Sequence, residues 1–81
     1  MSYRSKPVVK KFTGRTKLVV AFDIPENRNK LRHHFRRQLI AWDFRPVQKS
    51  VLESDRDYRH QLSQLISDLE LVDNVEIYKT K

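Results

Sequence analysis

The stretch Leu18-Val19-Val20-Ala21-Phe22-Asp23-Ile24-Pro25 decides how this chain folds. Its apolar run is far shorter than the roughly 20 residues of a membrane-spanning helix, and its length suits a buried β-strand. The run ends in the carboxylate of Asp23, followed by Pro25 and a strongly basic segment. An acid at the end of a core strand is held rigidly and can bind a hard cation or face a second copy of itself. Asp also commonly begins a turn or caps a helix, and position alone leaves both interpretations open.

Positive charge is concentrated at the N-terminal end of the chain. The 81 residues have a formal net charge of +7, with six Lys or Arg and no acid in residues 1–17. Residues 18–81 hold eleven basic and ten acidic residues, so they are nearly balanced. A segment of one sign beside a balanced domain is typical of contact with polyphosphate, and a solubilising tail is the alternative.

The composition predicts a basic arm followed by one small domain. Residues 1–16 are rich in charge and in turn-forming residues, so we expect a flexible arm in which Val8, Val9 and Phe12 are available for a short strand or a docking contact. Residues 17–81 make a single domain with a thin core, which association with a second copy would complete. The basic residues of the arm expected on nucleic acid are Lys10, Lys11 and Arg15.

The cellular setting expected from the sequence is the cytoplasm. The chain has no Cys, which excludes disulfides and thiolate zinc sites. No apolar segment of signal-peptide type follows the basic N-terminus, and the arm has no strong amphipathic face. We therefore expect no membrane partner.

Hydrophobic periodicity predicts the order strand, helix, strand, helix, strand. The predicted elements are a strand at 17–24, a helix from about Glu26 to Trp42, a strand at 47–53, a helix to about Leu71 and a strand at 75–78. Two amphipathic helices over one sheet form a two-layer α/β sandwich. The ferredoxin-like variant, βαβ(β)αβ, needs residues 45–54 to split into a short hairpin, and one long bent strand is the alternative. Ser54 and Asp57 have the spacing of a capping box before the second helix.

The first predicted helix carries an apolar stripe and a separate basic face. The stripe consists of Leu31, Phe35, Leu39 and Trp42, and the second helix has a similar stripe at Tyr58, Leu62, Leu65, Ile66 and Leu69. Arg28, Arg32 and Arg36 recur at steps of four, where like charges repel and reduce helix stability. Past Glu26 there is no acid until Asp43, which favours a phosphate-facing surface over a solvated face. The residues of this helix expected on nucleic acid are Arg28, Lys30, Arg32, Arg36 and Arg37.

The catalytic potential of the sequence rests on one carboxylate. We find no Ser-His-Asp or Cys-His arrangement, and Gly14 is the only glycine, so there is no Gly-rich phosphate loop. Metal-dependent phosphodiester cleavage needs carboxylates that converge on one ion. Asp23 is the one well-placed candidate, and two chains related by a twofold axis would supply two such groups. A structural Asp23 without catalysis is the alternative.

Several segments together resemble a known family. The segments Val19-Val20-Ala21-Phe22-Asp23-Ile24, the Arg-rich helix, Val47-Gln48-Lys49-Ser50-Val51-Leu52-Glu53 and Val75-Glu76-Ile77-Tyr78 are similar to CRISPR-associated protein two, over about residues 18–79. That family is the small subunit of the CRISPR spacer-acquisition complex in antiviral defence. The resemblance implies a ferredoxin-like homodimer that bridges two dimers of the integrase, CRISPR-associated protein one, and supports prespacer duplex DNA. It also implies DNA-backbone contacts at Arg28, Lys30 and Arg32. In the nuclease members of the family, it implies a Mg or Mn ion at Asp23.

Two other families share parts of the pattern. Asp23-Ile24-Pro25-Glu26 resembles the dimerisation domain of PaaX-type transcriptional repressors, whose DNA-reading winged helix has no counterpart in these residues. The VapD-like ribonuclease toxins share the fold and would make the chain an enzyme that acts on RNA. Because 81 residues starting at Met favour a stand-alone subunit, we expect first a non-catalytic or weakly nucleolytic adaptor. Its homodimer is expected to have Val47, Val51 or Ile77 at the join.

Overall fold

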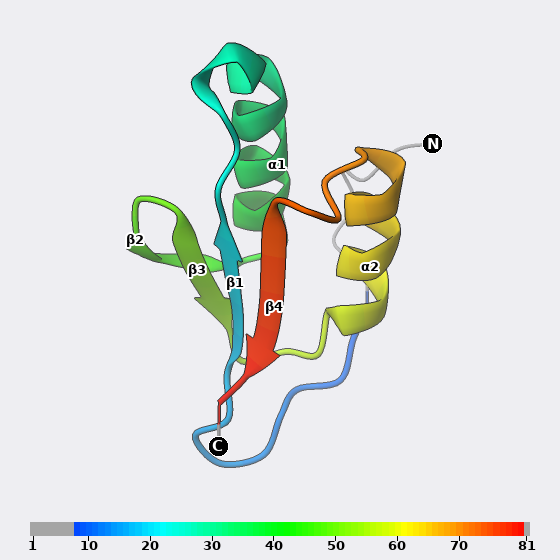
Figure 1. Cartoon of the computed structure of the whole chain (residues 1–81). Helices are drawn as coiled ribbons and strands as arrows, with labels where there is room; N and C mark the ends of the chain where they lie inside the picture. The colour runs from blue at the N-terminus through cyan, green and yellow to red at the C-terminus, as the bar shows by residue number, and fades with distance from the viewer. Residues whose placement is uncertain (1–7, 81) are drawn as a thin grey trace.

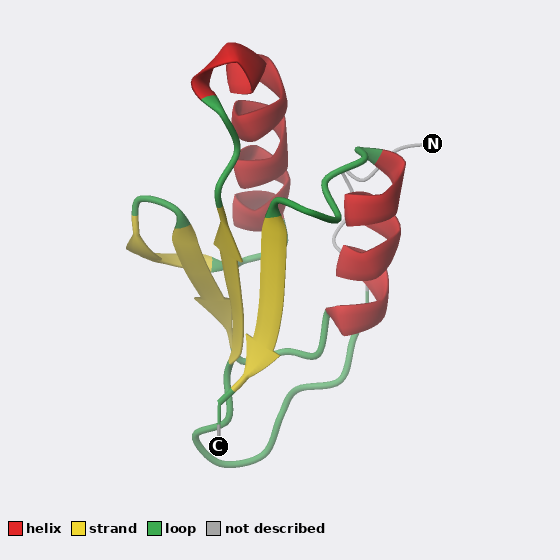
Figure 2. Cartoon of the chain, in the orientation of Figure 1, coloured by secondary structure: helices red, strands yellow, loops and turns green. Residues whose placement is uncertain are grey.

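The computed structural model describes residues 8–80 and shows two layers, one of strands and one of helices (Figures 1 and 2). The elements are β1 (Leu18–Phe22), the 3-10 turn η1 (Glu26–Arg28), α1 (Asn29–Ala41), β2 (Arg45–Gln48), β3 (Val51–Ser54), α2 (Arg59–Asp68) and β4 (Val75–Lys79). The four strands form one sheet in the order β2-β3-β1-β4, and every neighbouring pair is antiparallel. The predicted ferredoxin-like sandwich is confirmed.

The core lies between the two helices and one face of the sheet. Leu18, Val20 and Phe22 alternate along β1 and are all buried, as the period of a strand requires. The predicted helix stripes meet them: the buried members are Phe35, Leu39, Trp42, Tyr58, Leu62, Leu65 and Ile66, while Leu31 and Leu69 are partly buried at the margin. The strand and the two stripes therefore converge on one continuous core.

The short hairpin between β2 and β3 supplies the fourth strand. Lys49 and Ser50 turn the chain, and the pairing of β2 with β3 has an irregularity between Pro46 and Gln48. The backbone N–H of Phe22 donates to the carbonyl oxygen of Ser50 at 3.0 Å, which ties the turn to the end of β1. The hairpin alternative is therefore correct, and the single long strand is not.

Both α-helices begin later than the sequence predicted. The first prediction placed residues 26–28 in the helix, but they form a 3-10 turn and α1 starts at Asn29. The capping box is wrong, because Ser54 is a buried residue of β3 and α2 starts only at Arg59. Asp57 still assists this start, since its Oδ1 accepts a hydrogen bond from the N–H of Arg59 at 3.3 Å. No helix within residues 8–80 has the length and apolar character needed to cross a bilayer.

The described part of the N-terminal arm lies against the domain. The N–H of Phe12 donates to the carbonyl of Asp55 at 2.8 Å, and the side chains of Val9 and Phe12 pack against the core. In Figure 1 this segment runs past α2 before it enters β1. The expected docking contact is therefore present at Val9 and Phe12, whereas Val8 is fully exposed and takes no part in it. The first seven residues of the arm lie outside the described residues.

Candidate functional site

A basic face lies at the surface over η1 and α1, and we call it the arginine face. It consists of Arg28, the last residue of η1, and of Arg32 and Arg36 on α1. The three side chains follow one another at steps of four residues and are partly exposed. The ion pairs between described residues are Lys11–Asp55, Arg45–Glu53 and Arg59–Asp57, so none of them involves this face. The positive charge of the arginine face is therefore not balanced by a carboxylate within residues 8–80.

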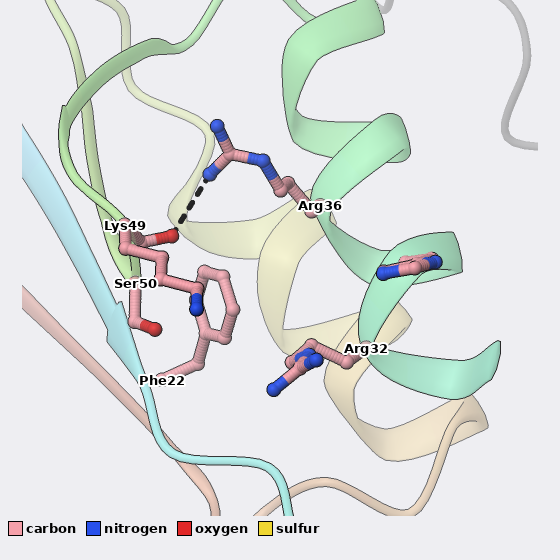
Figure 3. Close-up of a pocket in the computed structure, with 6 residues that line it drawn as sticks. Phe22, Arg32, Arg36, Lys49 and Ser50 are labelled. Atoms are coloured by element: carbon pink, nitrogen blue, oxygen red, sulfur yellow. Dashed lines mark hydrogen bonds between the residues drawn. The ribbon is translucent and has the colours of Figure 1, made fainter. Parts of the chain in front are cut away.

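Hydrogen bonds hold two arginines of this face. A guanidinium N–H of Arg32 donates to the side-chain oxygen of Asn29, one turn earlier on α1. Nη1 of Arg36 donates to the backbone carbonyl of Lys49 at 2.9 Å, as Figure 3 shows. Each bond uses one of the five donors of a guanidinium and leaves the others for a ligand. The two side chains are thus partly ordered without losing their capacity to bind an anion.

A pocket of about 210 Å³ lies between α1 and the β2–β3 turn. We call it the basic pocket; its lining residues are Phe22, Arg32, His33, Arg36, Lys49 and Ser50 (Figure 3). The sequence predicted Arg32 and Arg36 at an anion site, and the structure brings these two residues together. The sequence did not predict that Lys49 and Ser50 line this site, because the hairpin turn is what brings them to the pocket. The absence of Gly and Asn from that turn removed the usual signal for it.

The other predicted nucleic-acid residues are distributed over two places. Lys30 and Arg37 are exposed on α1 outside the basic pocket. The described basic residues of the arm lie beside the start of α2: Lys11 forms an isolated bridge with Arg56, and the carbonyl of Lys10 accepts a hydrogen bond from the N–H of Asp57 at 2.8 Å. Arg15 is exposed in the turn before β1.

Asp23 is exposed just beyond the end of β1, where its backbone is fixed to the turn before β4. Its N–H donates to the carbonyl of Asn74 at 2.8 Å, and the side-chain amide of Asn74 donates back to the carbonyl of Asp23 at 3.0 Å. Its side chain lines a surface pocket together with Asp73 and Glu76. Within the described residues, no group of three or more His, Cys, Asp or Glu is placed to hold a metal ion. Asp23 therefore has no such group around it within residues 8–80.

The sheet has a second face, opposite the helices. Strand pairing places Val19 opposite Glu53 on β3 and Tyr78 on β4. In the same way, Ala21 lies opposite Val51 and Glu76. We call this surface the open sheet face; it consists of Val19, Ala21, Val51, Glu53, Glu76 and Tyr78. Both described helices contribute to the core on the other side, and Tyr78 is 49% exposed. Of the residues predicted at the join, Val51 lies on this face, whereas Ile77 packs against the core.

Within residues 8–80, these features define a small ferredoxin-like domain with a basic helix and a sheet face on which no described helix packs. Residues 15–81 match the family model described as the PaaX protein central Cas2-like domain, and the chain belongs to this family. No curated protein and no solved structure matches the chain. The family confirms the Cas2-like character predicted from the sequence, and it agrees with the resemblance to PaaX-type repressors.

Proposed function

We propose that this chain is the dimerisation module of a PaaX-type transcriptional regulator and that two copies join through the open sheet face. The observation that carries the proposal is the one-sided packing of the sheet, which leaves Ala21, Val51 and Tyr78 accessible on the face opposite the described helices, around Val19, which is itself 7% exposed. Burying apolar surface contributes about 25 cal/mol per Å², and the core of so small a domain is thin. A twofold axis would bring the same face of each copy together. The family match supports this choice.

The proposal is tested by charging the open sheet face and measuring association. Tyr78→Glu places a carboxylate on that face, two residues after Glu76 on β4. It should weaken dimerisation at least tenfold, because interface aromatics carry a large share of binding energy. The matched control is Ile40→Glu on α1, since Ile40 is 43% exposed and Tyr78 is 49% exposed. Sedimentation over micromolar concentrations should show a dimer for the parent and the control, and a monomer for Tyr78→Glu.

Two outcomes would contradict the dimer model. A parent that remains a 9.8 kDa species at every concentration would show that the module does not associate. Dissociation caused by Ile40→Glu but not by Tyr78→Glu would move the interface from the sheet to α1.

The adaptor role in CRISPR spacer acquisition is the second candidate, because the arginine face offers positive charge without an acidic partner among the described residues. In that role the dimer would bridge two dimers of CRISPR-associated protein one and hold prespacer duplex DNA by its phosphates. Mixing the chain with that integrase and a duplex should then give one complex on size-exclusion chromatography. A regulator module would give no complex with the integrase.

A metal-dependent nuclease remains a prediction that requires the dimer. Asp23 continues the alternation of Val19 and Ala21, and it shares a pocket with Ala21, Val51 and Glu76, so it lies at the end of the open sheet face. A twofold dimer through that face would bring a second Asp23 to the same interface. Cleavage of DNA or RNA with Mg²⁺ or Mn²⁺ that is abolished by Asp23→Asn would support this activity. A dimeric parent that cleaves neither substrate would support the non-catalytic module.

A further inference from the structure

The basic pocket gathers positive charge from two separate elements. Arg32 and Arg36 come from α1, and Lys49 comes from the turn between β2 and β3. These three groups give the pocket a formal charge of +3, and none of them forms an ion pair with another described residue. Cations at i and i+4 destabilise a helix, and a third cation at close range adds to the repulsion. A bound anion would relieve this repulsion.

The pocket is ordered before any ligand arrives. Arg36 is held by the carbonyl of Lys49 at 2.9 Å, and the turn that carries this carbonyl is tied to β1 by the bond from the N–H of Phe22 to the Ser50 carbonyl at 3.0 Å. Arg32 is held by Asn29. Figure 3 shows the side chains of Arg32, Arg36 and Lys49 around the ring of Phe22. Side chains that are already ordered lose less entropy on binding, so more of the interaction energy appears as affinity.

Size and donor chemistry together restrict the ligand. A volume of about 210 Å³ equals the share of roughly seven waters and is below the roughly 300–1,000 Å³ of pockets that enclose whole drug-sized molecules. Two guanidinium groups, one ammonium group and the Ser50 hydroxyl suit an anion with several oxygens that point in different directions. A carboxylate has two oxygens and one charge, whereas a phosphate monoester carries about −1.5 to −2 charges at neutral pH and offers three oxygens.

We propose that the basic pocket is a binding site for a single phosphoryl group, held by Arg32, Arg36 and Lys49 with the Ser50 hydroxyl as an additional donor. Because His33 and Lys49 are exposed, the pocket reaches the surface, and the rest of a larger phosphorylated molecule would remain outside. None of its lining residues belongs to the open sheet face, so binding at the pocket can be measured separately from dimerisation.

Titration of the full chain with inorganic phosphate and with pyrophosphate, at constant ionic strength kept with chloride, tests the site. Amide chemical shifts of Lys49 and Ser50 should saturate with phosphate and should not move with chloride alone. Arg36→Gln and Lys49→Gln should each weaken the affinity for phosphate at least tenfold. A hydrogen bond to a charged group contributes about 1.5–3 kcal/mol, which is more than a factor of ten in the dissociation constant. The matched control is Arg37→Gln, which removes the same charge from the adjacent, exposed position outside the pocket.

Two results would overturn the proposal. Shifts that do not saturate, or that chloride reproduces, would show only general screening of α1. An equal loss of affinity in Arg37→Gln and Arg36→Gln would show a diffuse field in place of a defined pocket. Both results leave the sedimentation test of the dimer unaffected, so failure of the pocket and failure of the module are distinguishable.

A competition experiment identifies the source of the phosphoryl group. If duplex DNA displaces phosphate, and its affinity falls more in Lys49→Gln than in Arg37→Gln, the pocket holds a backbone phosphate. If pyrophosphate or a nucleoside monophosphate binds at the pocket while DNA does not compete, the source is a small phosphorylated ligand. Each result supports the pocket and names its occupant.

Discussion

Replacing Arg28, Arg32 and Arg36 by Ala tests whether the arginine face contacts the phosphates of duplex DNA. From Arg32 to Arg36 α1 rises about 6 Å at 1.5 Å per residue, and Arg28 lies in the 3-10 turn just before α1. One DNA strand carries a phosphate every 3.4 Å of axis, so Arg32 and Arg36 lie about two phosphates apart and each can have its own partner. Each neutralised phosphate adds about 0.9 to the log–log salt slope, which gives about 2.7 units per chain in contact.

The assay is the binding of two unrelated duplexes, measured by fluorescence anisotropy at several salt concentrations. Between 50 and 200 mM salt, a slope difference of 2.7 corresponds to about a 40-fold larger loss of affinity for the parent than for the triple variant. The effect should be the same for both sequences, because phosphate contacts carry no base information. The fold should be retained, since Ala has a higher helix propensity than Arg and the three residues lie outside the core.

A second triple variant separates local contact from net charge. Arg45, Arg59 and Lys79 are exposed on β2, α2 and β4, and their replacement by Ala removes the same three charges from other surfaces. If the two triple variants show equal slopes, the chain binds through its overall charge. If the arginine-face variant binds as tightly as the parent at every salt concentration, α1 is a solvated surface and the reasoning is refuted.

The remaining predictions concern stability. Leu39→Ala should lower the free energy of unfolding by about 2–5 kcal/mol in a denaturant titration, because Leu39 is fully buried, whereas Ile40→Ala at the exposed neighbouring position should change it by less than about 0.5 kcal/mol. Phe12→Ala should lower the melting temperature and increase amide exchange in residues 10–13, because its ring packs on the core and has the cations of Arg59 and Lys79 within 5.9 Å of its centre; unchanged exchange would mean that the ring does not hold the arm. The side-chain hydrogen bond from Arg59 lowers the pKa of the Asp57 carboxyl below its ordinary value of 3.8, so the stabilisation is complete above that value and is lost as the pH falls through the lower folded-state pKa. Below about pH 4, the free energy of unfolding measured by urea titration should therefore fall less steeply with decreasing pH in Asp57→Asn than in the parent. An equal dependence on pH in both proteins would rule out this linkage.

The core could be predicted from the sequence because its signal is periodic. The alternation of Leu18, Val20 and Phe22 and the spacing of Phe35 and Leu39 place these residues on one side of each element. Periodicity does not depend on distant contacts, so the element order and the sandwich followed from it. The boundaries did not follow, because a 3-10 turn at Glu26–Arg28 has the same composition as the first turn of an α-helix.

The candidate sites were predicted only in part. The column of Arg32 and Arg36 was visible because like charges at steps of four oppose helix formation. The role of Lys49 in holding Arg36 could not be predicted from the sequence. Its backbone carbonyl accepts the hydrogen bond from Arg36, and every residue type has such a carbonyl. Asp23 was identified as a carboxylate at the end of a core strand, but only the fold shows that it is exposed and shares a pocket with Asp73 and Glu76.

The position of Trp42 gives the protein a built-in optical probe. It is the only tryptophan of the chain, it is 1% exposed, and its ring stacks on Tyr58 with centroids 5.4 Å apart and planes inclined by 7°. The two rings come from the end of α1 and the start of α2, so they join the first β-α-β half of the chain to the second. Separation of the halves would expose the indole to water and shift its emission to longer wavelength. Because Trp42 belongs neither to the basic pocket nor to the open sheet face, its fluorescence follows unfolding without a contribution from ligand or partner contacts.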